Sequence, residues 1–318
     1  MVLLVERFNK FCSKLENHLH HSNNRPDGSA EEEASLLVSA LKGFESNVSS
    51  LINHLFLNPK PTSEILSLPW IHDCFEVLSM VNREFARLAV GIDYPMSKWK
   101  CASVEDYLNC SLSLLDHLNS ISASLSFLGQ ERICLFHALT LVESSPGSAI
   151  ERLKAIKLKT LSKGFKIEED MELVVGKETS NPNPNKEWVI NQALVEVKRV
   201  GFVVCRVVLA GLSGDEKFYL ERRNLTGNFT NLDSTIHGVI MEKGVVLKEI
   251  KDLNDEIVSL TAAIAKGEKT RNEAEEMKVR LKDFEELVDG LVKEVDSLFS
   301  EVLAERNSVL DCVRFRKQ

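Results

Sequence analysis

The 318-residue sequence has few aromatic residues and no long uninterrupted apolar run. Aromatic side chains make up only 7% of the chain, which disfavours a fold built from many short strands, whereas helix-forming residues fill most of its length. The most apolar region, residues 188–212, is interrupted by charged side chains, so it offers far less than the roughly 20 apolar residues that a spanning helix needs. We therefore expect an all-α fold without a transmembrane helix.

Excess positive charge is also missing. The net charge of −8 argues against broad affinity for nucleic acid. The seven cysteines form no C-x-x-C pair and no dense framework, which indicates a reducing compartment. The opening MVLLVERFNKF has too short an apolar run for a signal peptide and no basic residue ahead of it, and Glu6 and Glu16 are unfavourable in a transit peptide. We expect a cytoplasmic protein, with peripheral attachment to endomembranes as a second placement and the plastid as the less favoured one.

Motifs for nucleotide, cofactor and metal chemistry are absent. The fragment from Gly211 to Lys217 lacks the second glycine of a phosphate-binding loop, and no Gly-x-Gly-x-x-Gly follows a strand. A cluster of three histidines and one cysteine near the N-terminus has the spacing of none of the usual zinc sites. Its members are Cys12, His18, His20 and His21. We expect no cofactor and no metal.

The stretch LPWIHDCFEVL, residues 68–78, places His72, Asp73 and Cys74 side by side, which are the side-chain types of a thiol-nucleophile triad. Successive residues of a helix point about 100° apart, so three consecutive side chains cannot converge as a triad must. The flanking apolar residues keep a helical step of three and four: Ile71, Cys74, Leu78, Val81, Phe85 and Leu88. We predict a buried Cys74 thiol in a helix, with His72 and Asp73 on its surface.

Apolar residues at helical spacing predict a chain of amphipathic helices. The expected organisation is an N-terminal amphipathic helix (1–22), a linker (23–35), a central helical bundle (36–163), a loop or linker (164–186) and a C-terminal helical region (187–318). The first helix carries Leu4, Phe8, Phe11, Leu15 and Leu19, and the first helix of the bundle carries Leu37, Leu41, Phe44, Val48, Leu51 and Leu55.

A long helix is expected after residue 100, because Ser103 with Asp106 resembles a capping box, and we expect it to pause near Gly129. In the C-terminal region, apolar seams on either side of AKGEKT predict an antiparallel hairpin over residues 240–316. Each arm carries an apolar stripe, so we expect the hairpin to pack on the central bundle. The fold class is thus an elongated multi-helix bundle with a long C-terminal antiparallel hairpin.

One short helix is unusually basic for an acidic chain. Ser148 and Glu151 form a capping box in front of it, and its cations are Arg152, Lys154, Lys157, Lys159 and Lys163. A solvated face is the simplest interpretation. The alternative is peripheral contact with anionic lipid headgroups, to which each surface cation contributes about 1 kcal/mol.

Three segments resemble the plant BYPASS family. They are a Trp-led helix, a Pro-x-Ser-x-Trp loop and a Tyr-Leu-x-x-Ser-x-x-Leu-Leu-Asp helix, and they occur here in the family's order. The matching positions are Trp70, Pro95, Ser97, Trp99, Tyr107, Leu108, Ser111, Leu114, Leu115 and Asp116. The segments GQERICLFHALTLVES and VDSLFSEVLAERNSVLDCVR are also similar to their family counterparts.

The resemblance implies a helical plant protein without known catalytic residues, which acts in root and shoot development by restraining a root-derived, carotenoid-linked mobile signal. We therefore expect a non-enzymatic regulator or adaptor with protein partners. A membrane-trafficking adaptor of the exocyst type and an enzyme with a cryptic pocket are the alternatives.

Overall fold

The computed structural model describes residues 30–56, 64–156, 158, 184–216 and 230–315. Within these residues there are helices and no strands, so the predicted all-α class is confirmed. The helices are α2 (Ala30–Phe56), α3 (Leu68–Gly91), the short 3-10 helix η1 (Met96–Lys98), α4 (Cys101–Thr140), α5 (Pro146–Ala155), α6 (Lys186–Ser213), α8 (Thr230–Lys243), α9 (Lys248–Ala265) and α10 (Arg271–Phe315).

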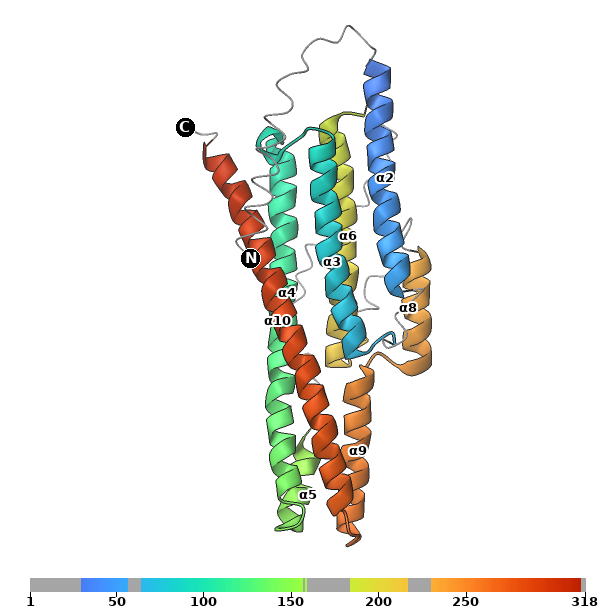
Figure 1. The fold of residues 1–318 in the computed structure, drawn as a ribbon, viewed down its shortest axis with the longest axis vertical. Helices are drawn as coiled ribbons and strands as arrows, with labels where there is room; N and C mark the ends of the chain where they lie inside the picture. The colour runs from blue at the N-terminus through green and yellow to red at the C-terminus, as the bar shows by residue number, and fades with distance from the viewer. Residues whose placement is uncertain (1–29, 57–63, 157, 159–183, 217–229, 316–318) are drawn as a thin grey trace.

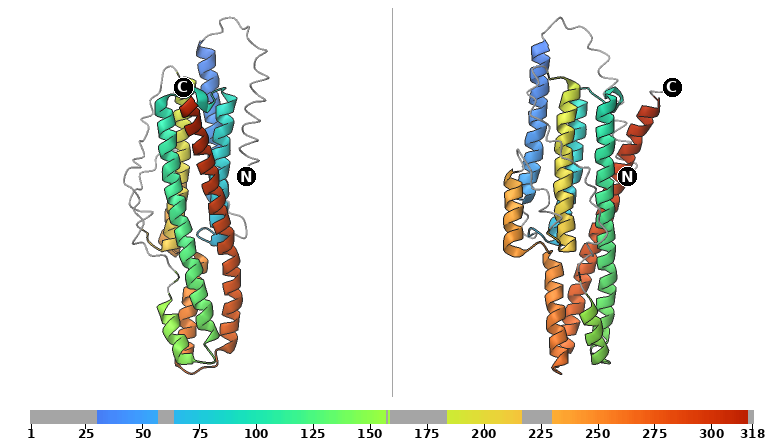
Figure 2. Two further views of the ribbon diagram at one scale, coloured as in Figure 1. Left: turned by 90° about the vertical axis from the view of Figure 1, so that its left-hand side faces the viewer. Right: turned by 180° about the vertical axis from the view of Figure 1, so that it is seen from behind.

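The bundle is elongated, and α4 and α10 run antiparallel along most of its length (Figure 1). In the upper half of that view, α2, α3 and α6 pack with the first part of α4 and the last part of α10, whereas α5 and α9 accompany them in the lower half. Figure 2 shows α6 lying alongside α3, with α2 on their outer side. One apolar cluster extends through both halves. The long antiparallel pair α4–α10 therefore holds the two halves together.

The helix α3 answers the question raised by residues 68–78. Ser67 caps it by accepting the Trp70 backbone N–H at 3.3 Å, and a proline lies in its first turn. Cys74 is fully buried, as predicted, and His72 is exposed and contacts Glu294 on α10. Asp73 is buried, so the prediction of a surface Asp73 was wrong. Asp73 is one of the twelve buried residues of α3, because α3 is covered on more than one side.

Several predicted helix boundaries were wrong. The helix α2 begins at Ala30, inside the segment expected to be a linker, and its buried seam continues through Ile52, whereas Leu51 is only partly buried. The helix α4 begins at Cys101, ahead of Ser103, and continues through Gly129 without a break. A helix packed along its length tolerates one glycine, because the cost of about 1 kcal/mol is small beside the apolar burial.

The C-terminal helices form the predicted hairpin, but its arms are unequal. Arg280 of α10 pairs with Glu256 of α9 at 2.7 Å near the turn, and α9 ends at Ala265 after 18 residues. The second arm, α10, has 45 residues and packs mainly on α4 and α3 beyond the end of α9. The predicted packing of α10 on the central helices is therefore present in the structure.

The helix α6 contains one buried cation, Arg206. The Arg206 guanidinium lies 4.7 Å from the centre of the Phe202 ring, which is a favourable cation–π distance. Among the described residues, no helix combines the length and apolarity needed to cross a bilayer.

Candidate functional site at the upper end of α4

A buried carboxylate joins the first turn of α6 to the start of α4. Both oxygens of Glu187 accept the Lys100 backbone N–H, at 3.1 and 3.2 Å, and the Ser103 and Tyr94 hydroxyls also donate to this carboxylate. Lys100 is the N-cap residue of α4 and makes no side-chain capping bond. Glu187 therefore caps α4 from another helix, where the unpaired N–H groups and the helix dipole favour an anion.

The pKa of Glu187 reflects this set of donors. Burial by itself raises the pKa of the carboxyl, but the bonds from Ser103, Tyr94 and the Lys100 backbone hold it below its ordinary value. The ionised form is therefore the one that the folded protein stabilises.

Aromatic rings connect this carboxylate to α10. The Trp99 indole N–H donates to the Tyr94 carbonyl at 3.1 Å, and Trp99 is almost completely buried. Its ring meets Phe85 and Tyr107 edge to face, with centroids 6.0 and 5.8 Å apart. Such pairs contribute about 0.5–1.5 kcal/mol each beyond the burial of their area.

A polar clasp then ties α4 to the last turns of α10. We use this name for Tyr107, Leu108, Ser111, Glu305 and Arg306. The Tyr107 hydroxyl donates to the Glu305 carboxylate at 3.2 Å, while the Arg306 guanidinium donates to the Leu108 carbonyl and to the Ser111 hydroxyl, the latter at 3.0 Å. Burial raises the pKa of Tyr107 well above its usual value, and the Glu305 charge adds to this effect, so the phenol remains a donor.

Two hollows lie near these groups. An open cleft of about 540 Å³ borders the Glu187 carboxylate and is lined by α2, α6 and the start of α4. A second hollow, between α3, α4 and α6, has room for about 30 Å³, which is the share of a single water, and its lining is mainly apolar. Its edge includes His117, whose pKa is lowered by burial, although the Ser113 carbonyl acts in the opposite direction.

The polar groups of this site hold helices to one another. The capping carboxylate, the phenol and the guanidinium each contact a second helix or the loop before it, and their partners are mostly backbone atoms or hydroxyls. Among the described residues, no group of three or more His, Cys, Asp or Glu side chains has the arrangement of a metal site. The arrangement is suited to fixing the relative positions of α4, α6 and α10.

The predicted basic site is only partly covered by the structure. Arg152 and Lys154 are exposed on α5, at the lower end of the bundle in Figure 1. The helix ends at Ala155, and Lys157, Lys159 and Lys163 lie outside the described residues. Its N-cap is Ser145, three residues before the predicted Ser148, and the two hydroxyls are hydrogen-bonded at 2.9 Å.

Sequence reasoning missed Glu187, Glu305 and Arg306. Their signal is weak, because a charged residue on an amphipathic helix is normally solvated and only the third dimension reveals its partner. The quoted resemblance contained a clue, since Tyr107, Leu108 and Ser111 belong to one matching segment and Arg306 to another. The structure brings these two segments together in the clasp.

The fold and this site define a class of protein: a long all-helical bundle whose strongest polar cluster fixes helix ends. Protein BPS1, chloroplastic, of Arabidopsis thaliana is 27% identical over 300 residues, which cover 88% of this chain and 85% of the relative. UPF0496 protein 4 of Oryza sativa is 28% identical over 183 residues in subspecies japonica and 29% over 185 in subspecies indica, with 52% of this chain and 39% of each relative covered. The similarity to the Arabidopsis protein over most of the chain supports the resemblance to the BYPASS family.

Neither a family model nor a solved structure matches the chain. None of the three relatives carries the name of an enzyme.

The comparison corrects the expected location. The Arabidopsis relative is named as chloroplastic, which contradicts the expectation of a cytoplasmic protein with the plastid less favoured. That expectation depended largely on Glu6 and Glu16, and two acidic residues are weak evidence against a plastid location.

Proposed function

We propose that this protein is a non-enzymatic helical regulator or adaptor in plant development. One observation carries the proposal: the segments that resemble the BYPASS family meet in the clasp, where they join α4 to α10. Residues used in this way fix the relative positions of two helices and so maintain the shape of the surface around them. The relatives come from two plants, which supports a role in plants.

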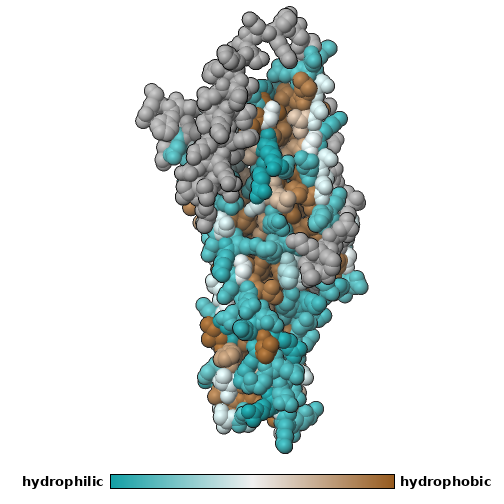
Figure 3. Space-filling model, viewed as in Figure 1, coloured by the Kyte–Doolittle hydropathy of each residue, from teal (hydrophilic) through white to brown (hydrophobic). Residues whose placement is uncertain are grey.

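The surface supports a role in protein contacts. Figure 3 shows a strip of apolar side chains along the upper half of the visible face, among mainly hydrophilic surroundings. Large apolar side chains are also exposed elsewhere, including Leu36 at 66% and Ile133 at 59%. Exposed apolar area of this kind is typical of surfaces that contact other proteins when it forms contiguous patches.

The finer part of the proposal follows from the family resemblance: the protein restrains a root-derived, carotenoid-linked signal that acts on the shoot. Grafting tests it. Roots that lack the protein should arrest a wild-type shoot, and blocking carotenoid synthesis in those roots should relieve the arrest. Continued arrest after the block would remove the carotenoid link from the proposal.

Complementation tests the absence of catalysis. Plants that lack the protein should recover normal root and shoot growth with the His72→Ala chain and with the Cys74→Ala chain as well as with the wild type. Loss of rescue by a Cys74→Ala chain that accumulates to wild-type levels and melts normally would point to a thiol nucleophile instead.

The name of the Arabidopsis relative supports a plastid location for this protein as well. A fluorescent fusion at the C-terminus tests this. The signal should coincide with chlorophyll in leaf cells, and an evenly distributed cytosolic signal would contradict the proposal.

A further inference from the structure

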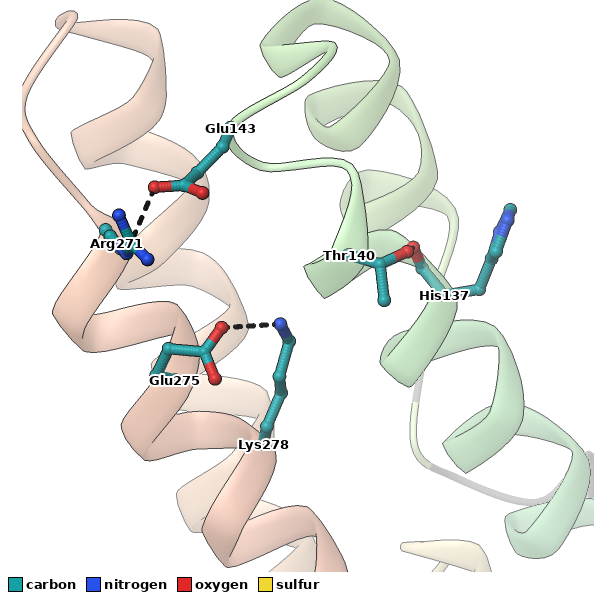
Figure 4. A network of polar contacts seen from close by, with 6 residues as sticks. All are labelled: His137, Thr140, Glu143, Arg271, Glu275 and Lys278. Carbon is teal, nitrogen blue, oxygen red and sulfur yellow. Dashed lines mark hydrogen bonds and ion pairs between the residues drawn. The ribbon is translucent and has the colours of Figure 1, made fainter.

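The solvent-facing side of the contact between α4 and α10, here called the outer seam, differs in side-chain chemistry between its lower and upper halves. In the lower half it is closed by ion pairs: Arg132 meets Glu285 at 2.8 Å, and Glu143 meets Arg271 at 3.3 Å. Figure 4 shows the second of these pairs, with the Lys278–Glu275 pair of α10 beside it. Such side chains suit contact with water, and the lower part of α4 also exposes Ile133 at 59% and Phe136 at 48%.

The upper half of the same seam exposes leucines. Leu112 of α4 is 47% exposed and Leu303 of α10 is 39% exposed. Leu108 and Phe299, one turn away from them on their own helices, pack against the core but are only partly buried. We call these four residues the upper seam.

The clasp shows that the upper seam is one continuous surface. Two consecutive residues of each helix take part in the contact between α4 and α10. Tyr107 of α4 bonds to Glu305 of α10, and the next residue, Leu108, bonds to Arg306. On α4 Tyr107 is buried and Leu108 only partly buried, whereas on α10 Glu305 is exposed and Arg306 partly buried. Leu112 lies one turn after Leu108 and Leu303 one turn before Arg306, so the hydrogen bond between Arg306 and Leu108 on antiparallel helices places the two leucines at a similar level.

The rim of the upper seam is acidic. Glu105 and Asp116 on α4 lie within one turn of Leu108 and Leu112, and Asp296 on α10 lies within one turn of Phe299. All three are exposed, and none of them is in an ion pair within the described part of the chain. An apolar groove between two helices with acidic edges fits an amphipathic helix that has an apolar stripe and basic flanks.

We propose that residues 4–19 of this chain dock as a helix in the upper seam. Their apolar stripe is Leu4, Phe8, Phe11, Leu15 and Leu19. Arg7 and Lys14 each lie within one turn of Phe11 and supply the basic flank that the acidic rim requires.

The position of the chain permits this contact. Described structure begins at Ala30, the first residue of α2, at the same end of the bundle as the start of α4. The ten residues 20–29 span up to about 33–36 Å when extended, which exceeds the breadth of three helices packed at about 8–10 Å. A helix over residues 4–19 is about 24 Å long and can lie along the seam from its upper end.

Photo-crosslinking in the full 318-residue chain tests the proposal. Leu112 is replaced by p-benzoylphenylalanine, and the exposed Val258 of α9 is replaced in the same way as the matched control. Irradiation should join position 112 to a peptide within residues 4–19 of the same chain, and position 258 should give no such product. Changing both Phe8→Asp and Phe11→Asp should abolish the cross-link.

Charge reversal provides the second arm. Asp116→Lys should lower the cross-link yield, and adding Lys14→Glu to that chain should restore it. Three results would overturn the proposal: no cross-link from position 112 to residues 4–19, a product with the mass of two chains, or a yield that the Phe8 and Phe11 changes leave unaltered. A two-chain product would assign the upper seam to a second copy.

Discussion

Glu187→Ala should destabilise the bundle more than removal of an exposed carboxylate beside the same cleft. Wild-type Glu187 accepts the Lys100 N–H and the Ser103 and Tyr94 hydroxyls, and alanine removes the acceptor of the first two, while the Tyr94 hydroxyl keeps the Lys98 carbonyl at 2.9 Å. A hydrogen bond to a charged group contributes about 1.5–3 kcal/mol, but water entering from the adjoining cleft replaces part of the loss. The expected decrease in the free energy of unfolding is about 2–4 kcal/mol.

Thermal melts and urea unfolding of the full chain measure this decrease. At about 2–4 °C per kcal/mol the melting temperature should fall by roughly 4–16 °C. Glu33→Ala is the matched control, because Glu33 lines the same cleft with its carboxylate exposed, and its removal should change stability by about 0.5 kcal/mol or less. A Glu187→Ala chain within about 0.5 kcal/mol of the wild type would refute the capping role.

Four further predictions follow from the same packing. The pKa of Glu187 is held below its ordinary value of 4.5, so its ionised form stabilises the fold above that pH, and this contribution is lost as the pH falls through the lowered pKa. The stability difference between the wild type and Glu187→Gln should therefore shrink in acid melts. A constant difference from pH 7 to pH 3 would contradict this. Gly290→Ala, at an exposed position of α10, should raise the free energy of unfolding by about 0.5–1 kcal/mol. Gly211→Ala should lower it by about 1–3 kcal/mol, because a Cβ there would lie 2.7 Å from Leu247 Cδ2. Calorimetry should therefore show changes of opposite sign. Cys74→Ala should lower stability by no more than about 3 kcal/mol, and failure of this chain to fold would mean that the α3 core is less tolerant than its packing indicates. Leu291→Asp should unfold the whole domain, since Leu291 is 3% exposed in the shared core; melts at two concentrations that lose only self-association would contradict a shared core.

Much of the architecture could be predicted because burial imposes a period on the sequence. The seams of α2, α3, α9 and α10 are readable at steps of three and four, and the buried Cys74 follows from its place in one of them. Helix ends were harder, because the α4 cap comes from Glu187, 87 residues further along the chain than Lys100. No local pattern encodes such a partner.

The candidate site was largely out of reach for the same reason. The basic residues between Arg152 and Lys163 were selected because the rest of the chain is acidic. A local excess of positive charge does not show what those side chains contact in the folded protein. Asp73 illustrates the opposite error: it was expected on the surface, yet α3 is enclosed by α2, α6 and α10 and leaves little of its circumference in water. Glu305 and Arg306 could have been connected to Tyr107 and Ser111 only through the antiparallel pairing of α4 with α10.

The central claim, a regulator that acts through macromolecular contacts, is tested most directly by affinity purification of the tagged full chain from root tissue, with mass spectrometry of the proteins and small molecules recovered. The account predicts that a distinct protein co-purifies at similar yield with the wild type and with Cys74→Ala, and that the purified chain leaves the small molecules of a root extract unchanged over time. Conversion of one of those molecules into a product, in proportion to the amount of protein added and lost in Cys74→Ala, would contradict it.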